Sequence, residues 1–159
     1  MTIEFPERAL PPPGTVVRPA VDPVFFLLLR DHPLLSSYGL TIDFAQDLST
    51  RTPPFLRFGV VRYLEPSVPG ESTPICSVDV YAADRLAAGD IARALADAWP
   101  YLKKLAIPSE SAYVSGAWVE LDPFLLEEPG QASTAEPLSR YHLEVGLRLH
   151  PLPKEAADG

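Results

Sequence analysis

Hydrophobic and polar residues alternate along five segments of the chain, and this period of two predicts half-buried β-strands. The segments are residues 39–46, 54–65, 75–82, 112–121 and 140–149. The last is the most regular, because its odd-numbered positions from Tyr141 to Leu149 are apolar and its even-numbered ones include His142, Glu144 and Arg148. The apolar faces of the first three strands are predicted to be Leu40, Ile42 and Phe44; then Leu56, Phe58 and Val60; then Cys76, Val78 and Val80.

The segment "PAVDPVFFLLLRDHPLLSSYG" (residues 19–39) predicts a helix. Asp22 is placed to be its N-cap, Pro23 suits the first helical position, and Gly39 suits the end. Pro33 is expected to break or kink the helix near its final turn, and His32 beside it is expected at the surface. The run from Phe25 to Leu29 is apolar on nearly every side, so it must be buried in the core or covered by another subunit.

A second helix is predicted after the third strand, with Asp84 as its N-cap. The expected buried stripe is Leu86, Ile91, Leu95, Ala98 and Leu102. Pro100 should redirect the chain near the end of this helix, because proline removes a backbone donor and clashes with the preceding turn.

The predicted order is therefore helix, three strands, helix, two strands. Runs of strands separated by one helix are typical of an α+β fold, here a mixed or antiparallel sheet of about five strands with two main helices on one face. A length of 159 residues matches one domain. We assign residues 1–18 to an extended proline-rich arm, 19–152 to a single α+β domain, and 153–159 to a flexible tail.

Net charge excludes some partners. The chain carries a formal charge of −8, and its 13 basic residues are scattered. An acidic surface repels nucleic-acid phosphates and anionic lipids, so direct binding to either is not expected. The apolar run "VFFLLL" is too short to span a bilayer, and the N-terminus lacks the pattern of a signal peptide. We therefore expect a product made in the cytoplasm.

The junction "YAADRLAAG" between the third strand and the second helix is a candidate active site, because in α/β enzymes such junctions commonly hold phosphate loops and catalytic acids. It has no glycine before Gly89, so it does not resemble a phosphate-binding loop. Asp84 is explained by capping. Asp79 lies on the polar strand face, where a solvated or interface carboxylate is expected; as half of an acid–base pair it would need Asp43 nearby.

Other chemical patterns are weak. His142 and His150 share a strand face but are eight residues apart, about 26 Å and too far for one metal ion. Cys76, the only cysteine, is expected to be a small buried hydrophobe, and Ser115 is not in the turn that a nucleophilic serine needs. Phe58, Tyr63 and Tyr81 could suggest an RNA platform, which the acidic charge opposes. We expect no catalytic residue, metal or cofactor.

The strand-to-helix run "PICSVDVYAADRLAAGDIARALADAW" resembles the tail terminator proteins of long-tailed bacteriophages. Members of that family carry a similar "D-V-x-V-Y/W-A-x-D-R-x-x-A" passage and end in a strand that opens with "R-Y", as in "SRYHLEVGLRLHP" here. The segment "SGAWVELDPFLLEEPG" resembles their fourth strand and the acidic loop after it. The resemblance covers residues 18–152, although Pro23 and Pro33 stand where charged helix formers are usual.

This resemblance implies a subunit of a hexameric ring that caps the tail tube, stops its polymerisation and docks it to the head connector. Six copies at −8 each would carry −48 formal charges, and a negative lumen would let DNA pass as cargo. The implied partners are other copies, the tube protein and the connector or stopper, and the location is the neck of the virion. Asp79, Arg85, Arg148, Phe25 and Phe26 are the expected subunit or partner contacts.

Two alternatives stay open at this point. One is another neck protein, such as a head-completion or stopper protein. The other is a small-molecule-binding or hydrolytic α+β domain, which predicts a pocket with converging polar groups. A deep cleft with Asp43 and Asp79 side by side would favour the second alternative.

Overall fold

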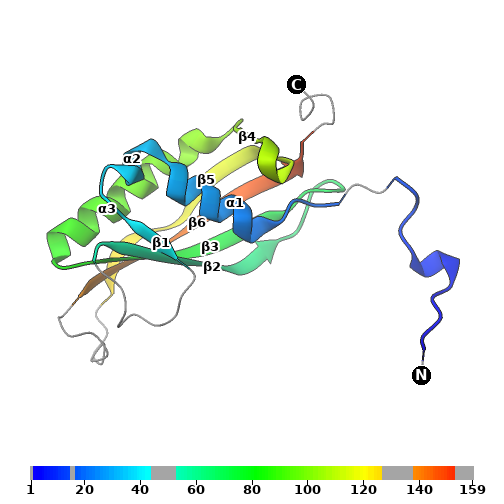
Figure 1. Cartoon of the computed structure of the whole chain (residues 1–159), viewed down its shortest axis with the longest axis horizontal. Helices are drawn as coiled ribbons and strands as arrows, with labels where there is room; N and C mark the ends of the chain where they lie inside the picture. Colours follow the sequence, from blue (N-terminus) through cyan, green and yellow to red (C-terminus); the bar gives the residue numbers. More distant parts are fainter. Residues whose placement is uncertain (1, 15–16, 44–52, 127–137, 153–159) are drawn as a thin grey trace.

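A computed structural model of the chain describes residues 2–14, 17–43, 53–126 and 138–152. The fold is α+β, as the segment order predicted: three α-helices lie over one face of a single mixed sheet (Figure 1). The sheet curls, and the face turned away from the helices forms its hollow side. We call this second face the open face.

The sheet contains six strands in the order β1-β2-β3-β6-β5-β4. β1 pairs in parallel with β2, and the remaining neighbours are antiparallel. The sequence predicted about five strands. The additional one lies at the sheet edge and is too short to show an alternation of apolar and polar residues. The bounds are β1 Thr41–Asp43, β2 Phe55–Leu64, β3 Thr73–Ala82, β4 Ala106–Ile107, β5 Ala112–Leu126 and β6 Ser139–Pro151.

The predicted strand faces are confirmed wherever the structure describes them. Leu56, Phe58, Cys76, Val78 and Val80 are buried in the core between the sheet and the helices, and Ile42 and Val60 pack against it. The same holds for the apolar positions of β6. Phe44 and the rest of the first predicted strand beyond Asp43 lie outside the described residues.

The first predicted helix is two helices, α1 (Val21–Asp31) and α2 (Pro33–Ser36). Pro33 does break the helix, and Gly39 follows in the left-handed region at φ 68°. The predicted cap was wrong: Ala20 is the N-cap, without a side-chain hydrogen bond, and Asp22 is already helical. His32, between the helices, accepts a 3.2 Å hydrogen bond at Nδ1 from the Leu34 amide and so caps α2.

The second predicted helix is α3 (Arg85–Ala98), and Asp84 is its N-cap: its Oδ1 accepts a 2.8 Å hydrogen bond from the Ala87 amide. Leu86 was wrongly placed in the buried stripe: it is 75% exposed, because at about 100° per residue it lies on the side of α3 opposite to the buried Ala88 and Leu95. Ala88, Ala92 and Trp99 are buried instead. As expected of Pro100, the chain leaves the α-helix there and continues as the 3₁₀-helix η3 (Trp99–Leu102).

Trp99 joins the layers of the core. Its ring stacks on Phe25 of α1 at 5.8 Å, and its indole Nε1 donates a 2.9 Å hydrogen bond to the carbonyl of Gly146 in β6. On the opposite face of β6, Trp118 of β5 lies directly over the same glycine: a Cβ built there would come within 2.4 Å of the indole. Gly146 therefore sits between the two tryptophans, and no other residue fits without displacing one of them.

The arm was predicted to be extended, and it is so only in part. Residues 2–14 reach away from the domain (Figure 1) and contain a 3₁₀ turn, η1 (Glu7–Ala9). The flanking Pro6 and Leu10 have extended backbone angles. Every described residue of the arm is exposed. A further 3₁₀ turn, η4 (Pro108–Glu110), precedes β5, and no helix among the described residues is long and apolar enough to cross a membrane.

Candidate functional site: a charge network on the open face

Asp79 lies near the middle of β3, between Val78 and Val80. Because strand side chains alternate, these two valines enter the core and Asp79 points to the open face. The strand registers place Arg57 of β2 opposite it on one side and His142 of β6 on the other. A row of charged side chains therefore crosses three adjacent strands.

The carboxylate of Asp79 is buried and surrounded by partners, with only 5% of the residue exposed. Oδ1 lies 2.8 Å from His142 Nδ1 and 3.2 Å from Arg140 Nε. Oδ2 accepts hydrogen bonds from Arg140 Nη2 at 3.3 Å and from Arg57 Nη2 at 3.4 Å. We expected this carboxylate to be in solvent or at an interface. It is instead buried within the protein, where Arg57, Arg140 and His142 surround it.

The row continues toward the far end of β6. His142 Nε2 lies 3.8 Å from Glu144, and Arg62 bridges two acids at 3.2 Å each, Glu144 and Glu120. Trp118 Nε1 donates a 2.7 Å hydrogen bond to Glu120. We call the whole set the charge network: Arg57, Arg62, Asp79, Glu120, Arg140, His142 and Glu144.

Aromatic rings close the network at its sides. Phe124 of β5 meets the His142 ring edge-on at 5.5 Å. Tyr81 is fully buried, stacks on Phe55 at 4.7 Å, and has the guanidinium groups of Arg57 and Arg140 within 6 Å of its ring. Burial raises the pKa of the Tyr81 phenol, so it stays neutral over the physiological range.

The pairing of Asp79 with His142 has the geometry of an acid that orients a catalytic imidazole. With a proton on Nδ1, His142 donates to the carboxylate and its Nε2 is the basic atom. That atom faces Glu144, and no described serine, threonine or cysteine forms a hydrogen bond with the imidazole. Within the described chain the pair therefore lacks a nucleophile, and the geometry is that of an ion-pair lattice.

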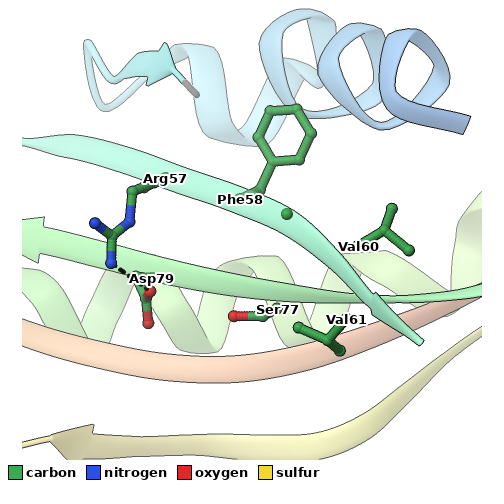
Figure 2. A pocket seen from close by; sticks show the side chains of 7 residues that line it. Arg57, Phe58, Val60, Val61, Ser77 and Asp79 are labelled. Carbon is green, nitrogen blue, oxygen red and sulfur yellow. Dashed lines mark hydrogen bonds and ion pairs between the residues drawn. The ribbon is translucent and has the colours of Figure 1, made fainter. Parts of the chain in front are cut away.

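A hollow of about 460 Å³ lies beside the network, on the open side of β2 and β3. Figure 2 shows Arg57, Ser77, Asp79 and Val61 pointing away from the helices, whereas Phe58 points toward them. The lining residues are Arg57, Phe58, Gly59, Val60, Val61, Ser77 and Asp79. The hollow is open to solvent and its only acidic lining residue, Asp79, is already paired with Arg57.

Asp43 and Asp79, the possible acid–base pair, do not lie on neighbouring strands. Asp43 is opposite Arg57, and Arg57 is opposite Asp79, so β2 separates the two aspartates. Two strand spacings amount to about 10 Å between their backbones. Ser115, the serine considered as a nucleophile, donates a hydrogen bond to the Arg148 carbonyl at 3.4 Å. The aromatic residues of the possible RNA platform are not on one surface, because Phe58 and Tyr81 lie on opposite faces of the sheet.

The five expected contact residues do not form one surface. Asp79 is in the charge network, and Arg85 is exposed at the first position of α3. Arg148 lies 3.4 Å from the buried carboxylate of Glu71. Phe25 is fully buried against Trp99, so for this residue the core alternative holds, while Phe26 is half-buried with Arg30 5.4 Å above its ring.

Cys76 is buried in the core, as expected, and burial raises the pKa of its thiol to about 12. The thiol is therefore protonated and shielded from reagents in the folded protein. Among residues 2–14, 17–43, 53–126 and 138–152, no group of three or more histidine, cysteine, aspartate or glutamate side chains is placed to hold a metal ion.

Sequence reasoning missed a second buried acid, Glu71, which is 3% exposed in the turn before β3. It accepts a hydrogen bond from the Thr73 hydroxyl at 3.1 Å and lies 3.4 Å from Arg148 and 3.9 Å from His150. The sequence contained a signal that predicts both clusters. Charged residues occupy the polar-face positions of neighbouring strands: Arg57, Asp79, His142, Glu144 and Arg148. Opposite charges at such positions predict cross-strand pairs.

No protein-family model matches the chain, and no curated protein matches it.

Proposed function

We propose that this chain is a structural subunit of a virus particle: the tail terminator of a long-tailed bacteriophage. In this proposal, copies of the chain assemble into a ring, a hexamer as the resemblance implies, and the ring caps the tail tube. The ring stops tube polymerisation and docks the tube to the head connector. The protein works in the neck of the virion after assembly in the host cytoplasm.

The observation that carries the proposal is the apolar surface of the described chain. Large apolar side chains stay exposed along the arm and along the outer half of β2, where exposure is 71% for Ile3, 66% for Phe5, 54% for Val61 and 57% for Tyr63. Exposed apolar residues gathered on one segment and one strand are typical of protein–protein contact sites. A subunit that assembles with other copies and with other virion proteins needs such surfaces.

The charge network supports the same class of function. Its acids and bases are paired with one another across four strands, which holds the curl of the sheet in a fixed shape. A catalytic carboxylate or imidazole has to reach a substrate atom, whereas the oxygens of Asp79 are occupied by its neighbours. A rigid subunit shape is what a closed ring requires.

Electron microscopy of lysates from the parent phage, with this gene disrupted, tests the proposal. A tail terminator predicts filled heads beside over-long tubes that carry no head. Tails of normal length beside empty or leaking heads would instead indicate a stopper, the second neck protein considered. Ordinary infectious particles would refute a role in the tail and return attention to a binding or hydrolytic domain.

A further inference from the structure

The chain leaves helix α3 through a corner that presents an aromatic ring to solvent. In the 3₁₀-helix η3 three residues make one turn, so Trp99 and Leu102 lie on the same side of it, and both are buried. Tyr101, between them in the sequence, points away from that side, and 88% of it is exposed. The two buried neighbours therefore hold the exposed tyrosine in a fixed position.

Two lysines follow directly. Lys103 and Lys104 are the only adjacent basic residues in a chain of net charge −8, and both are exposed. Within the described part of the chain, no carboxylate forms an ion pair with either ammonium group. Leu105, next to them, is 41% exposed. We call Tyr101, Lys103, Lys104 and Leu105 the basic patch.

The backbone of the basic patch is fixed to β5. The Lys104 N–H donates a 2.6 Å hydrogen bond to the Val114 carbonyl, and the Val114 N–H donates a 2.8 Å hydrogen bond to the Leu105 carbonyl. Lys104 has a φ of 76°, in the left-handed region that glycine adopts more easily than any other residue. A lysine in this turn, with no ionic partner in the described chain, indicates a use for its charge outside the subunit.

The arm carries the complementary side chains. Residues 2–7 contain two acids and two large apolar residues but no basic one: Ile3, Glu4, Phe5 and Glu7. All of them are exposed, and the backbone at Pro6 is extended, with φ −65° and ψ 151°. Extended segments that contain proline dock on exposed aromatic rings, because they lose little conformational freedom on binding. The arm therefore matches the basic patch both in charge and in apolar character.

We propose that Ile3–Glu7 of one copy docks on the basic patch of a neighbouring copy. The two carboxylates of the arm pair with Lys103 and Lys104, and the ring of Phe5 packs on the ring of Tyr101. The inference rests on self-association, the part of the proposed function that concerns copies of this chain, and not on the tail itself.

The arm is long enough for this contact. It leaves the domain at Pro19 and reaches away from it (Figure 1). The 17 residues from Thr2 to Arg18 can extend to about 55 Å, enough to reach a neighbour. Because the arm and the basic patch are different surfaces, each copy can give one arm and accept another. Such a head-to-tail contact is the kind that closes a ring.

An exchange of charges between purified full-length variants tests the contact. E4K/E7K makes the arm basic, and K103E/K104E makes the patch acidic. In sedimentation experiments each variant alone should show a dissociation constant for self-association about tenfold or more above that of the parent, because like charges then meet. An equimolar mixture of the two variants should associate as the parent does, since each arm then finds a patch of opposite charge.

Three results would overturn the proposal: a parent protein that does not self-associate, variants that associate as well as the parent, or a mixture without recovery. The melting temperatures of the variants should match that of the parent, since these side chains are outside the core. If K103E/K104E is less stable, K103E/K104G replaces it, because glycine adopts the left-handed turn without strain.

Carbodiimide coupling identifies the paired residues. The reagent joins a carboxylate to an amine in contact with it, with loss of water. A mixture of unlabelled and heavy-isotope-labelled parent protein should yield peptides that link Glu4 or Glu7 to Lys103 or Lys104 and contain both isotopes. Linked peptides that always contain a single isotope would mean that the arm folds onto its own patch, and would contradict the exchange between copies.

Tyr101→Ala tests the aromatic part of the contact. It should raise the dissociation constant by about fivefold or more, because exposed tyrosines are frequent binding hot spots. Tyr38→Ala, which truncates another exposed tyrosine, is the control and should leave the constant unchanged. Equal constants for Tyr101→Ala and the parent would contradict the proposal. All of these assays use purified protein, so a phage with normal tails would refute the tail role while leaving the exchange of arms established.

Discussion

The two faces of the sheet are held by different forces. The helix-covered face is closed by apolar side chains such as Leu95, Leu143 and Trp99, all fully buried. The open face is closed by ion pairs around Asp79, whose partners are themselves partly exposed. Apolar burial stabilises in proportion to the area removed from water, whereas a buried ion pair gives little net stability but is costly to break. The first face should therefore supply stability and the second should fix shape.

Trp99→Ala should have the largest effect, because it empties the centre of the helix-covered face. We expect a loss of about 4 kcal/mol in the free energy of unfolding, measured by denaturant titration. Leu86→Ala, a truncation of an exposed side chain in α3, is the control and should change stability by less than about 0.5 kcal/mol. Similar losses in both variants would mean that the helix layer does not pack as described.

Asp79→Ala should be nearly as damaging, because it removes the buried carboxylate that Arg57, Arg140 and His142 share. The expected loss is about 3 kcal/mol. Arg62→Ala, which removes more exposed pairs of the same network, should cost about 0.5 kcal/mol. Adding Arg140→Leu to Asp79→Ala should recover part of the loss, since one of the charges that faced the lost carboxylate is then removed. No recovery would show that the carboxylate has a role beyond pairing.

Alkaline pH should weaken the helix-covered face through Cys76. The ordinary pKa of the thiol is 9.0, and burial raises it to about 12 in the folded protein. Between these values the unfolded chain releases a proton that the folded chain keeps, so stability should fall by about 1.4 kcal/mol per pH unit and be unaffected below pH 9. The difference between the parent and Cys76→Ala curves isolates this effect; parallel curves would contradict it.

Asp84→Ala should have the smallest effect, about 1 kcal/mol, because it removes one capping hydrogen bond from α3. Asp84→Asn retains an acceptor and should lose less. Thermal unfolding followed by circular dichroism measures both. Equal losses would indicate that the charge of Asp84 at the helix end, rather than the hydrogen bond, provides the stabilisation.

The sequence predicted the helix-covered face far better than the open one. A period of two identifies which strand positions share a face, and so Val78, Val80 and Leu143 were placed correctly. The same period says nothing about what covers the other face. The partners of Asp79 come from positions 22, 61 and 63 residues away, so they depend on strand registers that a local pattern does not contain.

The helix errors have similar physical causes. Asp22 was predicted to be a cap because aspartate and a following proline are typical of helix starts, but the helix begins two residues earlier, at Val21, without any side-chain cap. Leu86 does not fit the helical period of the buried residues: at about 100° per residue it lies on the side of α3 opposite to Ala88 and Leu95. Trp99 was left out of the predicted stripe although the helical period includes it, since it lies four residues after Leu95 and three before Leu102.

The two tryptophans on either side of Gly146 provide an intrinsic fluorescence signal for each face of the sheet. The chain has only 2 tryptophans, one on each side of this glycine. Trp118→Phe leaves an emitter enclosed in the helix-covered core, and Trp99→Phe leaves one on the open face beside Glu120. The fluorescence of these two variants can therefore follow the loosening of each face separately, in the same molecule and without an added dye.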